Sequence, residues 1–156
     1  GLRGRIHHSV CKWCYPKVSL EELAIAGKAM GLQSIELLGP GEWETVKKHG
    51  LTCAITSNPV KNGLGGITKG FNRLEHHDTL VAAYEELIPL AAKAGLKNVI
   101  CFSGNRAGMD DASGLKNCAT GLKRLMGVCE RNQVTLVMEL LNSRVDHADY
   151  MCDRSA

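Results

Sequence analysis

The apolar residues of this chain follow two patterns that alternate from one end to the other. Short, nearly continuous apolar runs are typical of strands buried on both faces, whereas apolar residues at three- and four-residue spacing are typical of helices. The runs predict five strands, over Arg5–Cys11, Ser34–Leu38, Leu51–Thr56, Asn98–Ser103 and Val134–Leu141. The helical spacing predicts helices between them, over 20–30, 43–49, 75–93 and 113–131. The polar remainder, 145–156, predicts a loop that enters a further helix.

Capping residues and apolar faces support the predicted helices. Ser19 and Glu22 have the spacing of a capping box, and Gly31 is placed to end the first helix. The long third helix has one predicted apolar side, made of Leu80, Tyr84, Leu87, Ile88 and Ala91. The fourth has another, made of Leu115, Cys118, Leu122, Leu125, Met126 and Cys129. Four glycines between residues 58 and 72 predict a loop there.

The alternation of strands and helices predicts an α/β fold with a parallel sheet, because parallel neighbours need a crossover of a dozen or more residues. An open doubly wound sheet and part of an eight-stranded barrel are the two candidates. No glycine-rich nucleotide-binding motif follows any strand, and polar residues gather after strands two to five, as they do on the rim of barrel enzymes. We therefore expect residues 1–156 to form a single domain, a truncated (β/α)8 TIM barrel of about five units in sequential order, with the helices on one side.

Composition narrows the class of protein. The 156 residues are 44% hydrophobic and 22% charged, with a net charge of +3 spread along the chain and only 4% aromatic residues. This composition argues against a nucleic-acid surface, and no apolar stretch approaches the roughly 20 residues of a membrane span. Several of the seven cysteines lie in apolar segments, which is typical of reduced thiols and predicts a cytoplasmic protein. The first residue is Gly rather than Met, which is compatible with a cleaved export leader.

A few polar residues stand out because of their apolar surroundings. Glu139 lies inside the most apolar predicted strand and Glu36 inside the second, where an unpaired carboxylate would be costly. Glu139 is therefore a candidate metal ligand or acid/base group, or else a carboxylate paired with a neighbouring Lys or Arg. Glu36 is either a metal ligand or acid/base group, or a carboxylate held by an internal salt bridge or hydrogen bonds. His147 follows the fifth strand and is either a substrate contact or an ordinary loop residue.

The other histidines and a cysteine pair carry weaker predictions. One of His7 and His8 should point inward from the first strand as a satisfied core or rim residue, whereas His76 and His77 should be solvated. Cys11 and Cys14 have the C-x-x-C spacing of redox and zinc sites, but no second pair completes a zinc site. We expect both thiols to be unbonded and to hold no zinc.

Three segments carry a resemblance to a known family. The runs at 137–144 and 34–38 resemble the strand-five and strand-two motifs of the hydroxypyruvate isomerase family, which belongs to the xylose-isomerase-like TIM barrels. Residues 101–106 resemble the end of strand four in members described as hydroxypyruvate or sugar phosphate isomerases/epimerases. The resemblance extends from about Arg5 to Ser155 and is specific for the superfamily rather than for a substrate.

The resemblance implies a metal-dependent isomerase of a small hydroxycarbonyl compound, such as hydroxypyruvate, tartronate semialdehyde or a small sugar. A divalent ion of the Mg, Mn or Co class would be held by two Glu, one Asp and one His, of which only Glu139 is found in this chain. Glu139 would also move the proton of an enediol mechanism, Asn105, Arg106, Asn142 and His147 would bind substrate, and Glu36 would support the metal centre. The alternatives are a ketose 3-epimerase and a non-catalytic binding member.

A full barrel needs about 250 residues. We therefore expect this chain by itself to bind no metal strongly, to be inactive and to self-associate. We expect the intact protein to be a homo-oligomer.

Overall fold

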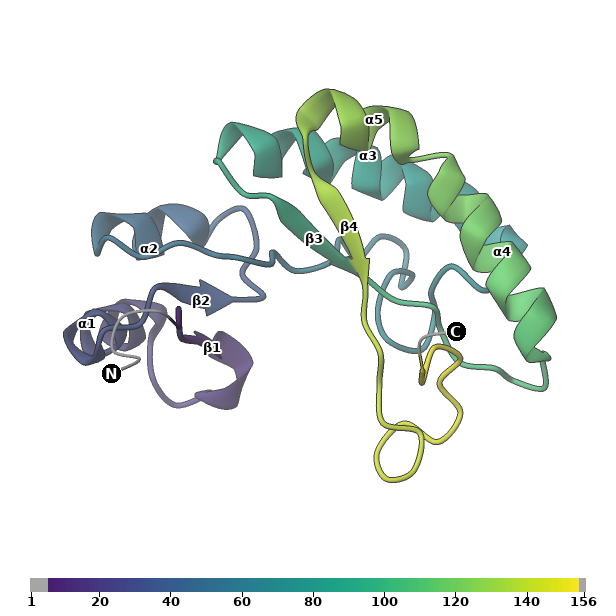
Figure 1. The fold of residues 1–156 in the computed structure, drawn as a ribbon, viewed down its shortest axis with the longest axis horizontal. Helices are drawn as coiled ribbons and strands as arrows, with labels where there is room; N and C mark the ends of the chain where they lie inside the picture. The colour runs from purple at the N-terminus through teal and green to yellow at the C-terminus, as the bar shows by residue number, and fades with distance from the viewer. Residues whose placement is uncertain (1–5, 155–156) are drawn as a thin grey trace.

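The computed structural model describes residues 6–154 and alternates strands with helices (Figure 1). Its strands are β1 (Ser9–Cys11), β2 (Ser34–Glu36), β3 (Asn98–Cys101) and β4 (Thr135–Met138). Its α-helices are α1 (Leu20–Met30), α2 (Trp43–Lys48), α3 (His77–Lys93), α4 (Asp111–Lys123) and α5 (Met126–Asn132). Two short 3-10 helices, η1 (Lys12–Cys14) and η2 (Leu74–His76), follow β1 and precede α3.

All strand pairings are parallel and sequential. β1 pairs with β2, and β3 pairs with β4. Between these pairs runs the segment 51–56, which forms one parallel bridge to β2 at Thr52 and another to β3 at Thr56. The order along the sheet is therefore β1, β2, segment 51–56, β3 and β4, which confirms the predicted sequential arrangement. The prediction of a regular third strand is wrong, since only its two ends pair with the neighbouring strands.

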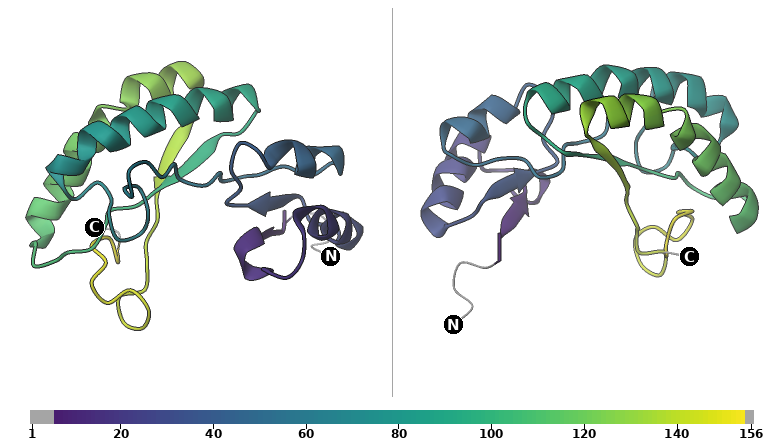
Figure 2. Two further views of the ribbon diagram at one scale, coloured as in Figure 1. Left: turned by 180° about the vertical axis from the view of Figure 1, so that it is seen from behind. Right: turned by 45° about the horizontal axis from the view of Figure 1, so that its top comes forward.

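The helices form the outer layer of an arch, with the strands on its inner side (Figure 2). The main hydrophobic core fills the space between these layers, and it contains residues that alternate along the strands, including Ile35 of β2 and Val99 and Cys101 of β3. A second cluster, built on Ile100, Phe102 and Tyr150, lies on the opposite face of β3. The sheet thus has an outer face covered by helices and an inner face on which Cys11, Glu36 and Glu139 follow the same alternation.

The local signals for α1 and α3 are confirmed. The Ser19 side chain accepts a hydrogen bond from the Glu22 N–H, Glu22 bonds back to the Ser19 N–H, and Gly31 ends α1 in the left-handed region at φ 87°. All five residues predicted for the apolar side of the long helix are buried. These features depend on residues close together in the chain, which explains why the sequence alone revealed them.

The predicted fourth helix is wrong as a single element. The chain turns between α4 and α5 at Arg124 and Leu125, where Leu125 is fully buried in the core although neither residue is a helix breaker. Leu115 and Met126, which the sequence placed on the apolar side, are 65% and 41% exposed. The break redirects α5 across α3, so tertiary packing rather than local propensity determines it. The predicted helix after residue 145 is also wrong within the described residues, because that segment consists of turns.

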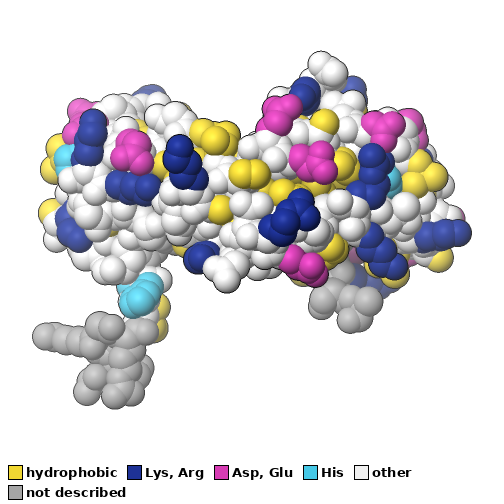
Figure 3. Space-filling model, turned by 90° about the horizontal axis from the view of Figure 1, so that it is seen from above, with side chains coloured by type: hydrophobic (Ala, Val, Ile, Leu, Met, Phe, Trp, Pro, Cys, Tyr) yellow, Lys and Arg dark blue, Asp and Glu magenta, His cyan; other side chains and the backbone are white. Residues whose placement is uncertain are grey.

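Charges of both signs are interspersed on the face viewed in Figure 3, without a large basic area. No helix in residues 6–154 is long and apolar enough to span a bilayer.

Candidate functional site

Three reactive side chains share the inner face near the carboxyl ends of the strands. Cys11 is opposite Glu36 in the β1–β2 pairing, and Glu139 directly follows β4. The pKa of the Cys11 thiol is raised, chiefly because burial disfavours the thiolate, and also by the negative charges of Cys14, Glu36 and Glu139. The structure therefore brings Glu139 and Glu36 to the same region, although more than 100 residues separate them in the sequence.

Glu36 is an internal hydrogen-bond acceptor, one of the two roles considered for it. Its carboxylate is buried and accepts hydrogen bonds from the main-chain N–H groups of Ala54 and Ile55, at 2.7 and 2.9 Å. The hydroxyl of Ser34, two residues earlier on the same face of β2, donates a third. Because Ala54 and Ile55 direct their N–H groups to this side chain instead of a strand, segment 51–56 does not form a regular ladder. Glu36 thereby attaches segment 51–56, which lies between the two pairs of strands, to β2.

Glu139 lies in a different environment. It is half-buried, and within residues 6–154 its carboxylate accepts no hydrogen bond. Burial raises the pKa of Glu139, and the nearby charge of His147 partly opposes this increase. A carboxylate with a raised pKa and free oxygen atoms is suited to accept and return a proton. Glu139 and His147 are thus a pair of predicted site residues linked through charge, and within residues 6–154 no hydrogen bond or ion pair joins their side chains.

The main chain around Glu139 and His147 is held by a C-terminal segment for which the sequence predicted no contacts. Residues 140–154 turn back toward the end of β3, where Met151 N–H bonds to the Gly104 carbonyl at 2.9 Å and Cys152 N–H to the Ser103 hydroxyl at 3.0 Å. Tyr150 is fully buried there, and its hydroxyl bonds to both Ser103 and Glu139. The sequence signal was a single aromatic residue in a polar segment, which is too little to assign a role.

The other predicted substrate contacts are partly engaged in holding the same segment. The Arg106 guanidinium pairs with Asp111, lies 3.8 Å from Asp153 and donates to the Met151 carbonyl at 3.1 Å. Asn142 uses its side-chain oxygen to accept the Arg144 N–H at 2.9 Å. Asn105 keeps its side chain free of these bonds and pairs with Tyr150 through an antiparallel bridge. Of these three residues, Asn105 has the side chain most available to a ligand.

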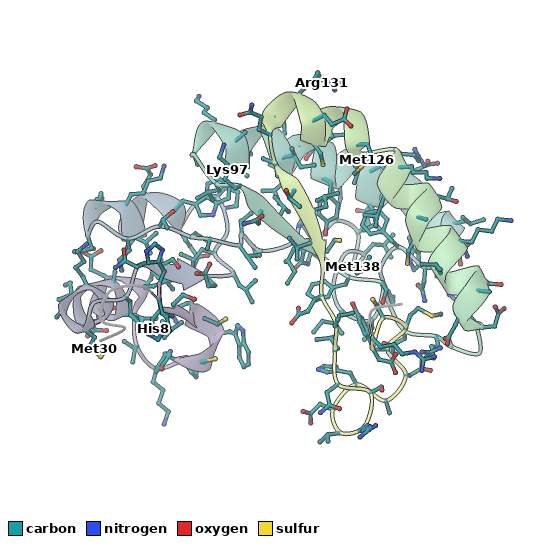
Figure 4. All side chains as sticks on the ribbon, viewed as in Figure 1. His8, Met30, Lys97, Met126, Arg131 and Met138 are labelled. Carbon is teal, nitrogen blue, oxygen red and sulfur yellow. The ribbon has the colours of Figure 1, made fainter. Side chains whose placement is uncertain are left out.

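Two histidine predictions are corrected. His7 and His8 precede β1, which begins only at Ser9, and both are exposed; His8 lies just before β1 in Figure 4. His77 is buried instead of solvated, at 3% exposure, because its Nε2 bonds to the Phe71 carbonyl at 2.8 Å. Gly121 of α4 allows this arrangement, since a Cβ there would lie 2.8 Å from the His77 ring nitrogen.

All seven cysteines have free thiols, and their environments differ. Burial raises the pKa of Cys53 to about 11 and the pKa values of Cys101 and Cys118 to about 12. Cys14 is exposed at the end of η1. The raised pKa of Cys11 is the opposite of the lowered value that activates a redox thiol.

Thiol alkylation at pH 8 is therefore expected to modify Cys14 first. A thiol with a pKa of about 11 is ionised in only roughly one molecule in a thousand at this pH, and burial also blocks access of the reagent. Cys53, Cys101 and Cys118 should react at least about 100-fold more slowly than Cys14 in the folded chain, as measured by mass spectrometry with iodoacetamide. In urea all seven should react. Equal rates for Cys101 and Cys14 in the folded chain would contradict the burial described here.

The described residues do not by themselves form a metal site. Within residues 6–154 no group of three or more His, Cys, Asp or Glu side chains is placed to hold an ion. Glu139 and His147 supply at most two donors, whereas protein sites for divalent ions normally use three or more. The residues present therefore fit one part of a metal site and not a complete one.

A cavity of about 490 Å³ lies between α4, the end of β4 and the returning C-terminal segment. Its apolar lining residues include Leu115, Cys118, Leu122, Met138 and Met151. Figure 4 places Met138 at the end of β4, just before this segment begins. Ser103, Arg106 and Asp153, which hold the returning segment, also line the cavity, whereas Glu36 and Glu139 do not. The two carboxylates therefore lie outside this cavity, on the inner face.

Comparison with solved structures establishes the fold class. The chain is similar to an AP endonuclease of family 2 from Brucella melitensis, with a TM-score of 0.72 and 16% identity over 94% of this chain and 59% of that one. It is similar to a 3-keto-D-glucoside 4-epimerase from E. coli, with a TM-score of 0.67 and 17% identity over 93% of this chain and 58% of that one. A D-psicose 3-epimerase from Clostridium cellulolyticum H10 gives a TM-score of 0.65 and 11% identity, over 91% of this chain and 55% of that one.

The chain thus has the fold of part of a TIM barrel, as predicted, and spans between half and three-fifths of the length of these structures. Identities below 20% establish the fold and not the activity. No protein-family model matches the sequence, and no curated protein matches it.

Proposed function

We propose that this chain is the N-terminal part of an isomerase or epimerase that acts on a small hydroxycarbonyl compound, either hydroxypyruvate or a small ketose. The observation that carries the proposal is Glu139, a half-buried carboxylate with free oxygen atoms and a raised pKa at the carboxyl end of β4. The inner-face location agrees with the rim on which TIM-barrel enzymes build their sites. The two epimerases among the similar structures act on sugars, which supports this substrate class.

In the proposed mechanism Glu139 removes a proton from the carbon beside the carbonyl group and returns it to a neighbouring carbon. The raised pKa makes its carboxylate a stronger base than an exposed one, and partial burial excludes water that would compete for the proton. The charge of His147 affects Glu139, and we propose that His147 donates a hydrogen bond to a substrate oxygen atom. An isomerase returns the proton to the former carbonyl carbon, while the hydroxyl proton passes between the two oxygen atoms of the enediol. A 3-epimerase returns a proton to the opposite face of the same carbon, which needs a second acid, and we propose that this acid lies outside residues 6–154.

The remaining substrate and metal contacts follow from the same site. We propose Asn105 as a direct contact, and Arg106 and Asn142 as contacts that also hold the returning segment. We propose that Glu139 supplies one ligand to a divalent ion whose other ligands come from polypeptide outside residues 6–154. Glu36 would maintain the main chain beside this centre through the bonds from Ala54 and Ile55.

The assembly and location are part of the proposal. We propose that residues 1–156 form one domain of a homo-oligomeric, cytoplasmic enzyme with no nucleic-acid partner. The mixed charges on the face viewed in Figure 3 support the proposal of no nucleic-acid partner. Within residues 6–154 β4 pairs with a strand on one side only, and an open strand edge favours association of the isolated chain.

We expect the isolated chain to be inactive and the product of its complete reading frame to show metal-dependent turnover. Both polypeptides would be assayed for interconversion of hydroxypyruvate and tartronate semialdehyde and for isomerisation and 3-epimerisation of a panel of ketoses, with and without EDTA. Product analysis separates isomerase from epimerase activity. Turnover by the isolated chain, or turnover of the longer product that survives EDTA, would contradict the proposal. Absence of activity from both, together with tight binding of a panel compound, would favour a non-catalytic binding protein.

A further inference from the structure

Tyr150 contacts both members of the Glu139–His147 pair. Its side chain is fully buried, and its hydroxyl donates a hydrogen bond to the Glu139 carbonyl at 3.0 Å. The same hydroxyl accepts a hydrogen bond from the Ser103 N–H, also at 3.0 Å. The main-chain N–H of Tyr150 donates to the His147 carbonyl at 2.9 Å. One residue therefore joins the end of β3, the residue after β4 and the turn that carries His147.

These bonds leave Glu139 little freedom in its main chain. Its N–H donates to the Cys101 carbonyl at 3.0 Å, so β3 holds one polar group of the residue and Tyr150 holds the other. Only the Glu139 side chain remains free of hydrogen bonds from residues 6–154. The turn with His147 is closed independently by its N–H, which bonds to the Asn142 carbonyl at 3.1 Å. Tyr150 contributes to the relative placement of these two parts, together with the bonds from the Leu141 N–H to the Cys152 carbonyl at 3.2 Å and from the Arg106 N–H to the Asp149 carbonyl at 2.6 Å.

The ring and the hydroxyl of Tyr150 have separable tasks. The ring packs with Ile100 and Phe102 in the inner-face cluster, which fixes where the hydroxyl lies. A tyrosine phenol keeps its proton at neutral pH, so the hydroxyl stays a donor. Arg106, which lies outside segment 140–154, also holds that segment through its contacts with Met151 and Asp153. Loss of the hydroxyl should therefore loosen the pair without detaching the segment.

We propose that Tyr150 is the positioning residue of the candidate site, whose hydroxyl and main-chain N–H set Glu139 against His147. The expected effect on catalysis rests on the proposed function, whereas the hydrogen bonds of Tyr150 do not depend on it. A purely structural tyrosine would contribute to stability alone, whereas a positioning residue also determines the alignment of the reacting groups. Misplacement of such groups by about 1 Å can reduce turnover about 100-fold.

The test is Tyr150→Phe, with Tyr84→Phe as the matched control. Tyr84 is equally buried, and its hydroxyl also donates to a main-chain carbonyl, that of Ile100, at 2.9 Å, but it lies in α3 on the outer side of the sheet. Hydrogen exchange of the 156-residue chain should accelerate at least about tenfold in peptides covering 139–149 for Tyr150→Phe, and by less than twofold there for Tyr84→Phe. In the product of the complete reading frame, kcat should fall about 10- to 100-fold with KM within about twofold for Tyr150→Phe.

A measurement on the unaltered chain covers the case in which Tyr150→Phe does not fold. The Tyr150 hydroxyl proton should be visible by NMR and show a nuclear Overhauser effect to the Ser103 amide proton, since the Ser103 N–H donates to the oxygen atom that carries the hydroxyl proton. Unchanged exchange over 139–149, or a missing hydroxyl signal, would overturn the positioning role. Faster exchange in Tyr150→Phe with no activity in the unaltered full-length product would refute the proposed function and leave the contact established. A fall in kcat of equal size in Tyr84→Phe would show that Tyr150 has a structural role and not a positioning role.

Discussion

Replacing Glu139 with Gln should reduce turnover of the full-length product about 10²- to 10⁴-fold, the range that general acid–base groups contribute. Gln keeps the volume of the side chain and loses the ability to take up a proton. Because no residue in 6–154 donates a hydrogen bond to the carboxylate, the amide breaks no contact there, and the free energy of unfolding should change by less than about 1 kcal/mol.

The pH dependence of stability gives this prediction a second readout. The folded-state pKa of Glu139 is raised by burial, so the protonated form is favoured by folding and ionisation weakens the fold. The stabilising contribution is present at pH values below the unfolded pKa and is lost as the pH rises through the folded one. Glu139→Gln should therefore match the unaltered chain in urea unfolding near pH 3 and be slightly more stable at pH 7.

Glu130→Gln is the matched control for this substitution. Glu130 is exposed on α5, and the change removes the same charge without touching the inner face. Its turnover should stay within about twofold of the unaltered protein. Full activity of Glu139→Gln, or an equal loss in Glu130→Gln, would show that Glu139 does not carry the reaction.

Replacing Glu36 with Leu should destabilise the chain by about 2–5 kcal/mol. The main-chain N–H groups of Ala54 and Ile55 would both lose their acceptor, and a buried unpaired donor costs about 1–3 kcal/mol. An apolar side chain cannot compensate, because these donors belong to the backbone and remain in place. Urea unfolding followed by circular dichroism measures the loss.

Glu36→Gln separates the hydrogen bonds of this residue from its charge. The Gln carbonyl can accept both N–H groups, and its amide can donate to the Ser34 hydroxyl, so the loss should be about 1 kcal/mol or less. If Glu36→Gln destabilises as much as Glu36→Leu, the charge and not the hydrogen bonds holds segment 51–56. If Glu36→Leu unfolds at the same urea concentration as the unaltered chain, Glu36 does not have the internal role described here.

The candidate site was predictable only in part. Glu36 and Glu139 were identifiable because a carboxylate in an apolar strand is unusual wherever the strand packs. What each residue contacts was not, since Ala54, which donates to the Glu36 carboxylate, lies 18 residues away, and Tyr150, which donates to the Glu139 main-chain carbonyl, lies 11 residues beyond it. Arg106 was singled out as a polar residue at a strand end, and its pairing with Asp111 and Asp153 emerged only from the structure.

The sequence by itself determined the α/β class, the sequential parallel order and the ends of α1, because these depend on residue periodicity and on caps formed within one helical turn. Tertiary structure decided the irregular path of segment 51–56, the break between α4 and α5, the burial of His77 and the return of residues 140–154. In most of these cases a buried polar or apolar group found its partner far along the chain, whereas His77 bonds to Phe71, only 6 residues earlier. Such partners satisfy main-chain hydrogen bonds and fill the core at positions for which local propensity has no preference.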